Sequence, residues 1–265
     1  MYNHFHLAQK YINYYLTASN GKGHGIHSPF VFDFIKKVLN DNKKYDSYSS
    51  IETVRNKMLA DERIIEVEDF GAGSLALPSK EKKINDIARS FLKSKKFAQL
   101  LFRIVKFYKP ATIIELGTSL GITSAYLAKA NDSSQLITLE GSVSTASVAK
   151  ENFELLDLQN IQLVTGNFDE TLPHILSKLK KLDLSFVDGN HRKIPTLNYF
   201  HQLISHSTQS TILIFDDIHW SKEMEEAWEE IQQHPQVTLT IDLFFIGLVF
   251  FRTDFKSKQH FIIRF

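Results

Sequence analysis

The sequence predicts an α/β fold in which an α-helical N-terminal extension precedes a mostly parallel sheet of seven strands. From Ala111 onward, short apolar runs alternate with stretches whose apolar residues recur at helical spacing, as in successive βαβ units. Most of these runs are nearly continuous, which is typical of strands buried on both faces of a parallel sheet. The last two runs have no helix between them, so we expect them to pair antiparallel as a terminal hairpin.

The helical N-terminal extension is expected to cover residues 1–95, and the α/β domain residues 96–265. The extension lacks strong strand runs, and its apolar residues recur three and four positions apart. Helices are expected at residues 11–16, 30–38, 84–91 and 100–105, the last of which stops near Pro110. The glycine-bearing loop at 68–74, with its Gly71–Ser74 turn, is a hypothetical lid over the site.

The α/β domain is expected to contain five strands in βαβ order and then the hairpin. The five strands are predicted at residues 112–116, 136–140, 161–165, 182–187 and 211–215, and the hairpin strands at 237–243 and 247–251. The helices are predicted at residues 122–130, 143–156, 171–179, 196–205 and 224–231.

The composition excludes several classes of protein. A formal net charge of +1 gives no basic excess, so we expect no nucleic-acid partner. The absence of cysteine rules out disulfides and thiolate metal sites. The N-terminus has no apolar signal segment and no apolar run is long enough to span a membrane. We therefore expect a cytoplasmic protein that makes no contact with a membrane.

Acids or glycines follow every one of the five parallel strand candidates. In open parallel sheets, ligands bind outside the carboxyl ends of the strands, so this shared edge predicts a binding site. In chain order these residues are Glu115-Leu116-Gly117, Glu140-Gly141, Gly166-Asn167, Asp188-Gly189-Asn190-His191 and Asp216-Asp217.

The first of these strand ends has the character of a nucleotide-binding turn. Gly117 and Gly121 bracket a tight strand-to-helix turn, where the lack of side chains lets a ligand approach the backbone. Glu140 can accept hydrogen bonds from both hydroxyls of a ribose, and Gly166-Asn167 can border an adenine ring. The alternatives are an ordinary βα turn for the two glycines and a solvated surface acid for Glu140.

The spacing of the glycines argues against a pyrophosphate ligand. A dinucleotide fingerprint has three glycines in the pattern G-x-G-x-x-G, whereas Thr118 follows Gly117 and the next glycine is Gly121. The sequence also lacks the G-K-[ST] of a phosphate-binding P-loop. Glu115 would repel a pyrophosphate but suits a ligand with an amino group. These residues favour S-adenosylmethionine, which has an adenosine, a sulfonium and an amino acid.

At this point the sequence resembles the class I S-adenosylmethionine-dependent methyltransferases, over residues 97–265. Residues 113–121, Ile-Ile-Glu-Leu-Gly-Thr-Ser-Leu-Gly, match the first motif of that superfamily, and residues 136–140, Leu-Ile-Thr-Leu-Glu, match the second. The resemblance implies a Rossmann-like sheet with the terminal antiparallel hairpin.

Within the superfamily, the chain is most similar to the catechol and caffeoyl-CoA O-methyltransferase group. In that group, an Asp after the fourth strand and an Asp-Asn pair after the fifth hold a divalent cation. The resemblance thus implies a metal site of Asp188, Asp216 and Asp217 for Mg²⁺ or another divalent cation, with Asp217 replacing Asn. His191 stands where the group has a Lys that deprotonates the substrate, and histidine can act as a base.

The expected reaction is methyl transfer to a hydroxyl of a small molecule. The alternatives are an N- or C-methyltransferase without metal, a nicotinamide-dependent oxidoreductase, and a non-enzymatic protein with this fold. The alternative role of the aspartates is to orient the substrate and cap the next helix. The alternative role of His191 is that of a polar residue at the start of a helix. A homodimer is left open. The expected catalytic residues are His191 and Asp188, and the expected cofactor-binding residues are Glu115, Gly117, Ser119, Gly121, Thr123, Glu140, Gly141, Gly166, Asn167 and Asp188.

Overall fold

The computed structural model describes residues 1–68 and 80–265, which form two compact units. Unit 1 comprises Met1–Asp41 and Lys178–Phe265, and unit 2 comprises Asn42–Ser177. The expected boundary between residues 95 and 96 falls inside unit 2 and stays a prediction. The Gly71–Ser74 turn of the hypothetical lid lies outside the described residues.

The α/β fold class is confirmed. The described residues contain a mostly parallel sheet of eight strands and a separate antiparallel pair, β1 (Ile64–Glu66) and β2 (Glu81–Lys83). The large sheet has one strand more than the seven expected, because β10 (Gln259–Ile262) pairs in parallel with β8 (Leu239–Asp242). The short β10 alternates between half-buried and exposed residues and follows a lysine-rich stretch, so it has no continuous apolar run.

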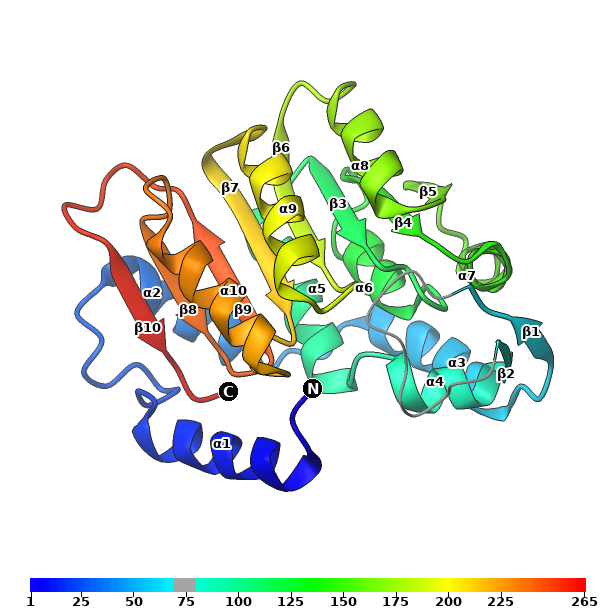
Figure 1. The fold of residues 1–265 in the computed structure, drawn as a ribbon, viewed down its shortest axis with the longest axis horizontal. Helices are drawn as coiled ribbons and strands as arrows, with labels where there is room; N and C mark the ends of the chain where they lie inside the picture. Colours follow the sequence, from blue (N-terminus) through cyan, green and yellow to red (C-terminus); the bar gives the residue numbers. More distant parts are fainter. Residues whose placement is uncertain (69–79) are drawn as a thin grey trace. The chain divides into compact units, whose positions relative to one another are not determined.

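Unit 2 contains the first three strands of the βαβ series and the helices that follow them (Figure 1). Its strands are parallel in the order β3-β4-β5, and the buried apolar residues of β3 and β4 explain why these segments form central strands. The elements are β3 (Thr112–Leu116), α6 (Ile122–Ala130), β4 (Gln135–Glu140), α7 (Val143–Leu155), β5 (Ile161–Thr165) and α8 (Phe168–Leu176).

The described residues of the N-terminal part of unit 2 form three helices besides β1 and β2, and the spacing of the apolar residues predicts two of these helices. The helix α3 (Asp46–Ala60) was not expected, because serines and charged residues separate its buried Ile51, Val54 and Met58. The other two helices are α4 (Ile84–Phe91) and α5 (Lys95–Tyr108), which ends just before Pro110.

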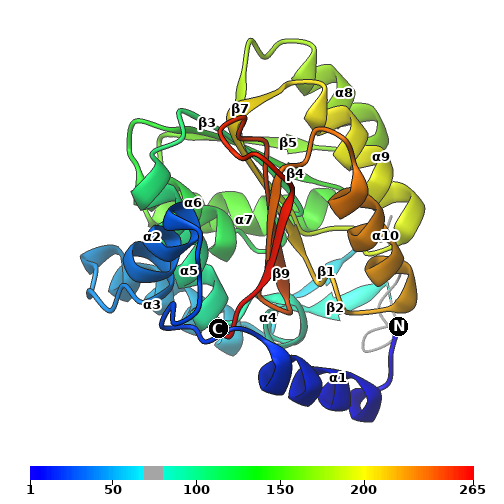
Figure 2. The same ribbon diagram turned by 90° about the vertical axis from the view of Figure 1, so that its left-hand side faces the viewer.

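Unit 1 contains the rest of the βαβ series. Its strands lie in the order β10-β8-β9-β7-β6, and β8 pairs antiparallel with β9, which confirms the terminal hairpin. Within this unit, α9 and α10 cover one face of the strands and α2 lies against the other (Figure 2). The elements are β6 (Leu182–Val187), α9 (Lys193–Ile204), β7 (Ser207–Asp216), α10 (Lys222–Gln233) and β9 (Ile246–Phe250).

The N-terminal residues of unit 1 form two helical segments. The first is α1 (His4–Thr17), in which the Asn3 side chain accepts a hydrogen bond from the His6 N–H and caps the helix start. The second is α2 (Pro29–Phe34), which continues as the π-helical turn Ile35–Leu39. Helix α1 packs its Tyr14 and Ala18 against Phe244 at the tip of the β8–β9 hairpin.

Candidate functional site

The turn after β3 has an unusual backbone in unit 2. Gly117, Ser119 and Gly121 all have positive φ angles, of 99°, 50° and 79°. The Gly117 and Thr118 N–H groups donate to Leu139 O at 2.9 and 3.2 Å, which fastens the turn to the end of β4. Gly121 is the N-cap of α6, whose first turn contains the buried Thr123. The structure therefore places three predicted cofactor residues, Gly117, Ser119 and Gly121, in one tight turn and Thr123 in the first turn of the helix that follows.

Glu115 lies at the foot of this turn with a fully buried side chain. Its Oε2 accepts hydrogen bonds from the hydroxyl of Ser124 and, at 2.7 Å, from that of Thr138. Thr138 is also 2.6 Å from the hydroxyl of Thr118 in the turn. A carboxylate held in this way ties β3, β4 and α6 together, and the predicted contact of Glu115 with a ligand amino group stays a prediction.

Glu140 ends β4 and reaches the same turn. Its Oε2 accepts the Ser119 N–H at 2.8 Å, and its Oε1 accepts the Ser142 N–H at 3.0 Å. These two bonds orient the carboxylate at the end of β4, and its predicted contact with ribose hydroxyls stays a prediction. Gly141 lies between Glu140 and Ser142, in the turn that leads into α7.

The end of β5 joins this part of the site through its backbone. The Gly166 N–H donates to Glu140 O at 2.9 Å, and Gly166 has a φ of 142°. The Asn167 side chain caps α8 by accepting the Asp169 N–H at 3.0 Å. Capping orients the Asn167 side chain at the start of α8, and its predicted contact with the adenine stays a prediction.

Unit 1 contains a second group of predicted site residues at the ends of β6 and β7. Among the described residues, Asp188, His191 and Asp216 each offer one ligand atom, and these atoms lie within 4.8 Å of one another. His191 Nε2 lies 3.6 Å from Asp188 Oδ1. Asp216 is 1% exposed, whereas Asp188 and His191 are half-buried. The structure thus brings together both predicted catalytic residues and one further predicted metal ligand.

The segment between Asp188 and α9 is strained. Asn190 and His191 have consecutive positive φ angles of 69° and 36°. Asparagine tolerates this region, but a histidine there costs roughly 1–3 kcal/mol. The Asn190 amide donates to the Tyr199 hydroxyl at 3.2 Å and anchors the loop to α9.

Asp217 lies outside this group of three. Its φ is 53°, and its N–H donates to Phe245 O at 2.6 Å. The structure therefore offers His191 as the third donor beside Asp188 and Asp216, where the sequence predicts Asp217. The role of Asp217 as a metal ligand stays a prediction.

Two carboxylates and an imidazole suit a divalent cation in their chemistry. Ligands on opposite sides of a cation bound at about 2.1 Å are about 4.2 Å apart. The 4.8 Å limit of this group exceeds that separation slightly, so small side-chain rotations would close the donors around an ion. The residues of the group fit a cation in type and nearly fit it in spacing.

The chain is similar to known methyltransferases over part of its length. Residues 114–218 match the family model for a methyltransferase domain, Methyltransf_24. By this similarity, residues 114–218 are referred to as the methyltransferase domain. It is also 34% identical over 91 residues to proteins from Rattus norvegicus and Mus musculus, each called a transmembrane O-methyltransferase homolog. That match covers 32% of this chain and 35% of each relative, so the chain spans about a third of the length of these curated relatives.

Solved structures show the same fold around the methyltransferase domain. An O-methyltransferase from Bacillus cereus in complex with S-adenosylhomocysteine has a TM-score of 0.56 at 20% identity, covering 83% of this chain and 97% of the other. A methyltransferase from Podospora anserina with the same ligand has a TM-score of 0.60 at 14% identity, covering 85% and 97%. Among the described residues, no helix is long and apolar enough to span a bilayer.

Sequence reasoning missed several residues that support the methyltransferase domain. Ser142 could have been found as the N-cap of α7, whose Thr145 N–H its hydroxyl accepts. His219 lies in the loop between β7 and α10, and its ring bridges Asp242 and Glu225. Burial lowers the pKa of His219, but hydrogen bonds to Asp242 and then Glu225 raise it, and the net pKa is above its usual value.

Proposed function

We propose that the methyltransferase domain binds S-adenosylmethionine and transfers its methyl group to a hydroxyl of a small molecule. The observation that supports this most is the turn from Gly117 to Gly121, whose Ser119 N–H is bonded to Glu140. Gly117 and Ser119 are the partly accessible residues of the turn, which has no phosphate-binding Lys, while Glu140 supplies the acceptor that ribose hydroxyls need. Solved relatives of this fold are named as O-methyltransferases, which favours oxygen as the acceptor atom.

In this proposal each group of residues has its own task. When bound, S-adenosylmethionine supplies an electrophilic methyl group on a sulfonium. Glu140 and the turn at Gly117–Gly121 hold the adenosine part. His191 takes the proton from the acceptor hydroxyl at Nε2, and Asp188 stabilises the imidazolium that results. The acceptor oxygen then bonds to the methyl carbon, and the electrons of the broken C–S bond remain on sulfur.

A divalent cation is a further part of the proposal. Asp188 and Asp216 would hold it, with either His191 or Asp217 as the third ligand. With a bound cation, the acceptor hydroxyl would lose its proton more readily, because the positive charge stabilises the alkoxide. If His191 is a ligand, its Nε2 or Nδ1 is occupied by the ion, so ligation and base catalysis through the same nitrogen are alternatives.

Methyl transfer from labelled S-adenosylmethionine to a panel of phenols, alcohols, carboxylic acids and amines tests the function. We expect label on hydroxyl compounds and a loss of about 10²-fold or more in His191→Ala. The control is His174→Ala, which removes a histidine near the end of α8. Label only on amines would contradict the hydroxyl acceptor, and full activity of His191→Ala would contradict the base. Activity that survives EDTA would contradict the cation.

A further inference from the structure

His219 lies three residues after Asp216, in the segment 216–220 that leaves β7. Its Nε2 is 2.7 Å from Asp242 Oδ2, and its Nδ1 is 3.1 Å from Glu225 Oε1. Both ring nitrogens of His219 are thus held by carboxylate side chains, one from β8 and one from α10. A side chain held at both nitrogens restrains its own backbone. The course of segment 216–220 is therefore tied to β8 and α10.

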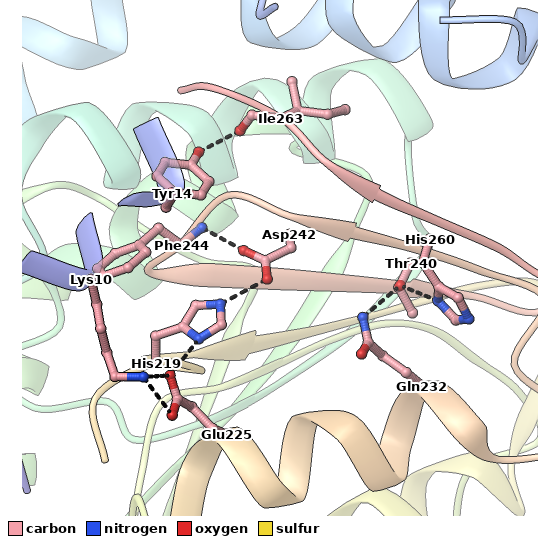
Figure 3. Close-up of polar contacts among 10 residues, drawn as sticks. All are labelled: Lys10, Tyr14, His219, Glu225, Gln232, Thr240, Asp242, Phe244, His260 and Ile263. Atoms are coloured by element: carbon pink, nitrogen blue, oxygen red, sulfur yellow. Dashed lines mark hydrogen bonds and ion pairs between the residues drawn. The ribbon is translucent and has the colours of Figure 1, made fainter. Parts of the chain in front are cut away.

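The N-terminus of the chain completes this arrangement from the other side of Glu225 (Figure 3). Lys10 Nζ of α1 lies 2.9 and 3.0 Å from the two oxygens of Glu225. The Tyr2 hydroxyl donates to Glu225 at 2.6 Å, and the Tyr2 N–H donates to Trp220 O at 3.1 Å. Glu225 therefore joins Lys10 of α1 to the ring of His219.

An aromatic cluster makes a second connection between α1 and the same segment. Phe244, at the hairpin tip, stacks on the His219 ring at 5.2 Å and contacts the rings of Tyr11 and Tyr14 at 5.1 and 5.2 Å. Phe244 is 2% exposed and has a φ of 71°, which a bulky residue rarely adopts unless its surroundings enforce it.

The hairpin tip passes this restraint to the backbone of the segment. The Phe244 N–H donates to Asp242 Oδ1 at 2.8 Å, so Asp242 fixes both the tip and His219. The next residue, Phe245, accepts the Asp217 N–H at 2.6 Å. Helix α1 therefore reaches the end of β7 by two routes, one ionic through Glu225 and one aromatic through Phe244.

We propose that α1, together with Tyr2 before it, positions the acidic end of β7 for methyl transfer, and that His219 is the positioning residue through which it acts. This role gives the N-terminal helix a function that its sequence does not reveal. The consequence for catalysis rests on the proposed function of Asp216, but the positioning of segment 216–220 does not.

Hydrogen–deuterium exchange of the full chain tests the positioning directly. In Lys10→Met and Glu225→Gln, we expect the amides of residues 216–220 to exchange about fivefold faster, because a partly buried charge pair is lost. The matched control is Lys222→Met, which removes an 82% exposed lysine lying 3.9 Å from Glu226 on the same helix α10. Tyr2→Phe removes one hydrogen bond from Glu225 and serves as a milder variant if the others fail to fold.

A kinetic readout separates positioning from a loss of stability. We expect Lys10→Met to lower kcat about tenfold and to leave the Kd for S-adenosylhomocysteine unchanged, since small displacements of reacting groups are costly. Unchanged exchange at 216–220 in Lys10→Met, Glu225→Gln and Tyr2→Phe, or equal acceleration in Lys222→Met, would overturn the proposal. If the unmodified chain transfers no methyl group, the proposed function fails while the exchange result still decides the positioning.

Discussion

Replacing Gly121 by alanine should be far more damaging than the same change at Gly25, although both glycines have nearly the same backbone angle. Their φ values are 79° and 81°. A Cβ on Gly121 would lie 2.6 Å from Phe153 Cε1, 3.0 Å from its Cζ and 3.2 Å from Ala149 Cβ. A Cβ on Gly25 would meet nothing within 4 Å. The pair therefore separates the cost of the backbone angle from the cost of the clash.

The expected magnitudes follow from these two contributions. A left-handed conformation costs a residue with a Cβ about 1–2 kcal/mol, which is the whole effect expected for Gly25→Ala. Overpacking a well-packed interior adds about 1–3 kcal/mol, so Gly121→Ala should lower the free energy of unfolding by about 2–5 kcal/mol. Phe153 is 6% exposed and packs in the interior, so it has little room to withdraw.

Urea denaturation of both variants, followed by circular dichroism, measures the difference. The substitution Phe153→Leu in the Gly121→Ala background should restore part of the loss, because it removes the ring atoms that the new Cβ meets. Gly121→Ala should also weaken binding of S-adenosylhomocysteine, since the turn must shift. Equal destabilisation by Gly121→Ala and Gly25→Ala, or no rescue by Phe153→Leu, would refute the reasoning.

Three further predictions concern other parts of the two units. Thr138→Val should cost about 1–3 kcal/mol in urea denaturation, because buried Glu115 loses a donor, while Thr165→Val at an exposed position should be near neutral. Burial raises the pKa of Glu225, but hydrogen bonds from Tyr2, Lys10 and His219 lower it to a net value below the usual range. Glu225 therefore stabilises the fold above about pH 4.3, and the gap in Tm to Glu225→Gln should shrink as the pH falls further; a gap that widens would contradict this. Mn²⁺ should raise Tm in a way that saturates with its concentration, and at a hundredfold excess over Kd the free energy of unfolding should be about 2.7 kcal/mol higher. Asp216→Asn should abolish the rise in Tm. An equal rise in Tm in Asp216→Asn would contradict a cation site at Asp188, His191 and Asp216.

The strands of the βαβ series were predictable because burial on both faces leaves a continuous apolar run. The bounds of β3, β5 and β6 agree with the sequence prediction residue by residue. The elements that escaped have weaker local signals: α3 mixes its apolar residues with serines and charges, and β10 is a short strand beside lysines. Tertiary contacts determine these elements more than their own composition does.

The candidate site shows the same division. The strand-end rule named Asp188, His191 and Asp216 as site residues, and the structure groups them. The network around His219 could not be predicted, because Asp242 is 23 residues away along the chain and meets it only once the hairpin forms. Glu115 was predicted as a cofactor-binding residue because of its charge. Its full burial could not be predicted, because it depends on hydrogen bonds from the hydroxyls of Ser124 and Thr138 that form only in the folded unit.

The central claim is that Glu140 and the turn from Gly117 to Gly121 bind S-adenosylmethionine. Isothermal titration of the full chain with S-adenosylhomocysteine tests it most directly, with NAD as the competing ligand. We predict saturable binding at one site and at least about tenfold weaker binding in Glu140→Ala, because a charged acceptor for the ribose is lost. Glu154→Ala, an exposed acid on α7, should bind as the unmodified chain does. Binding of NAD without S-adenosylhomocysteine, or undiminished binding by Glu140→Ala, would contradict the claim.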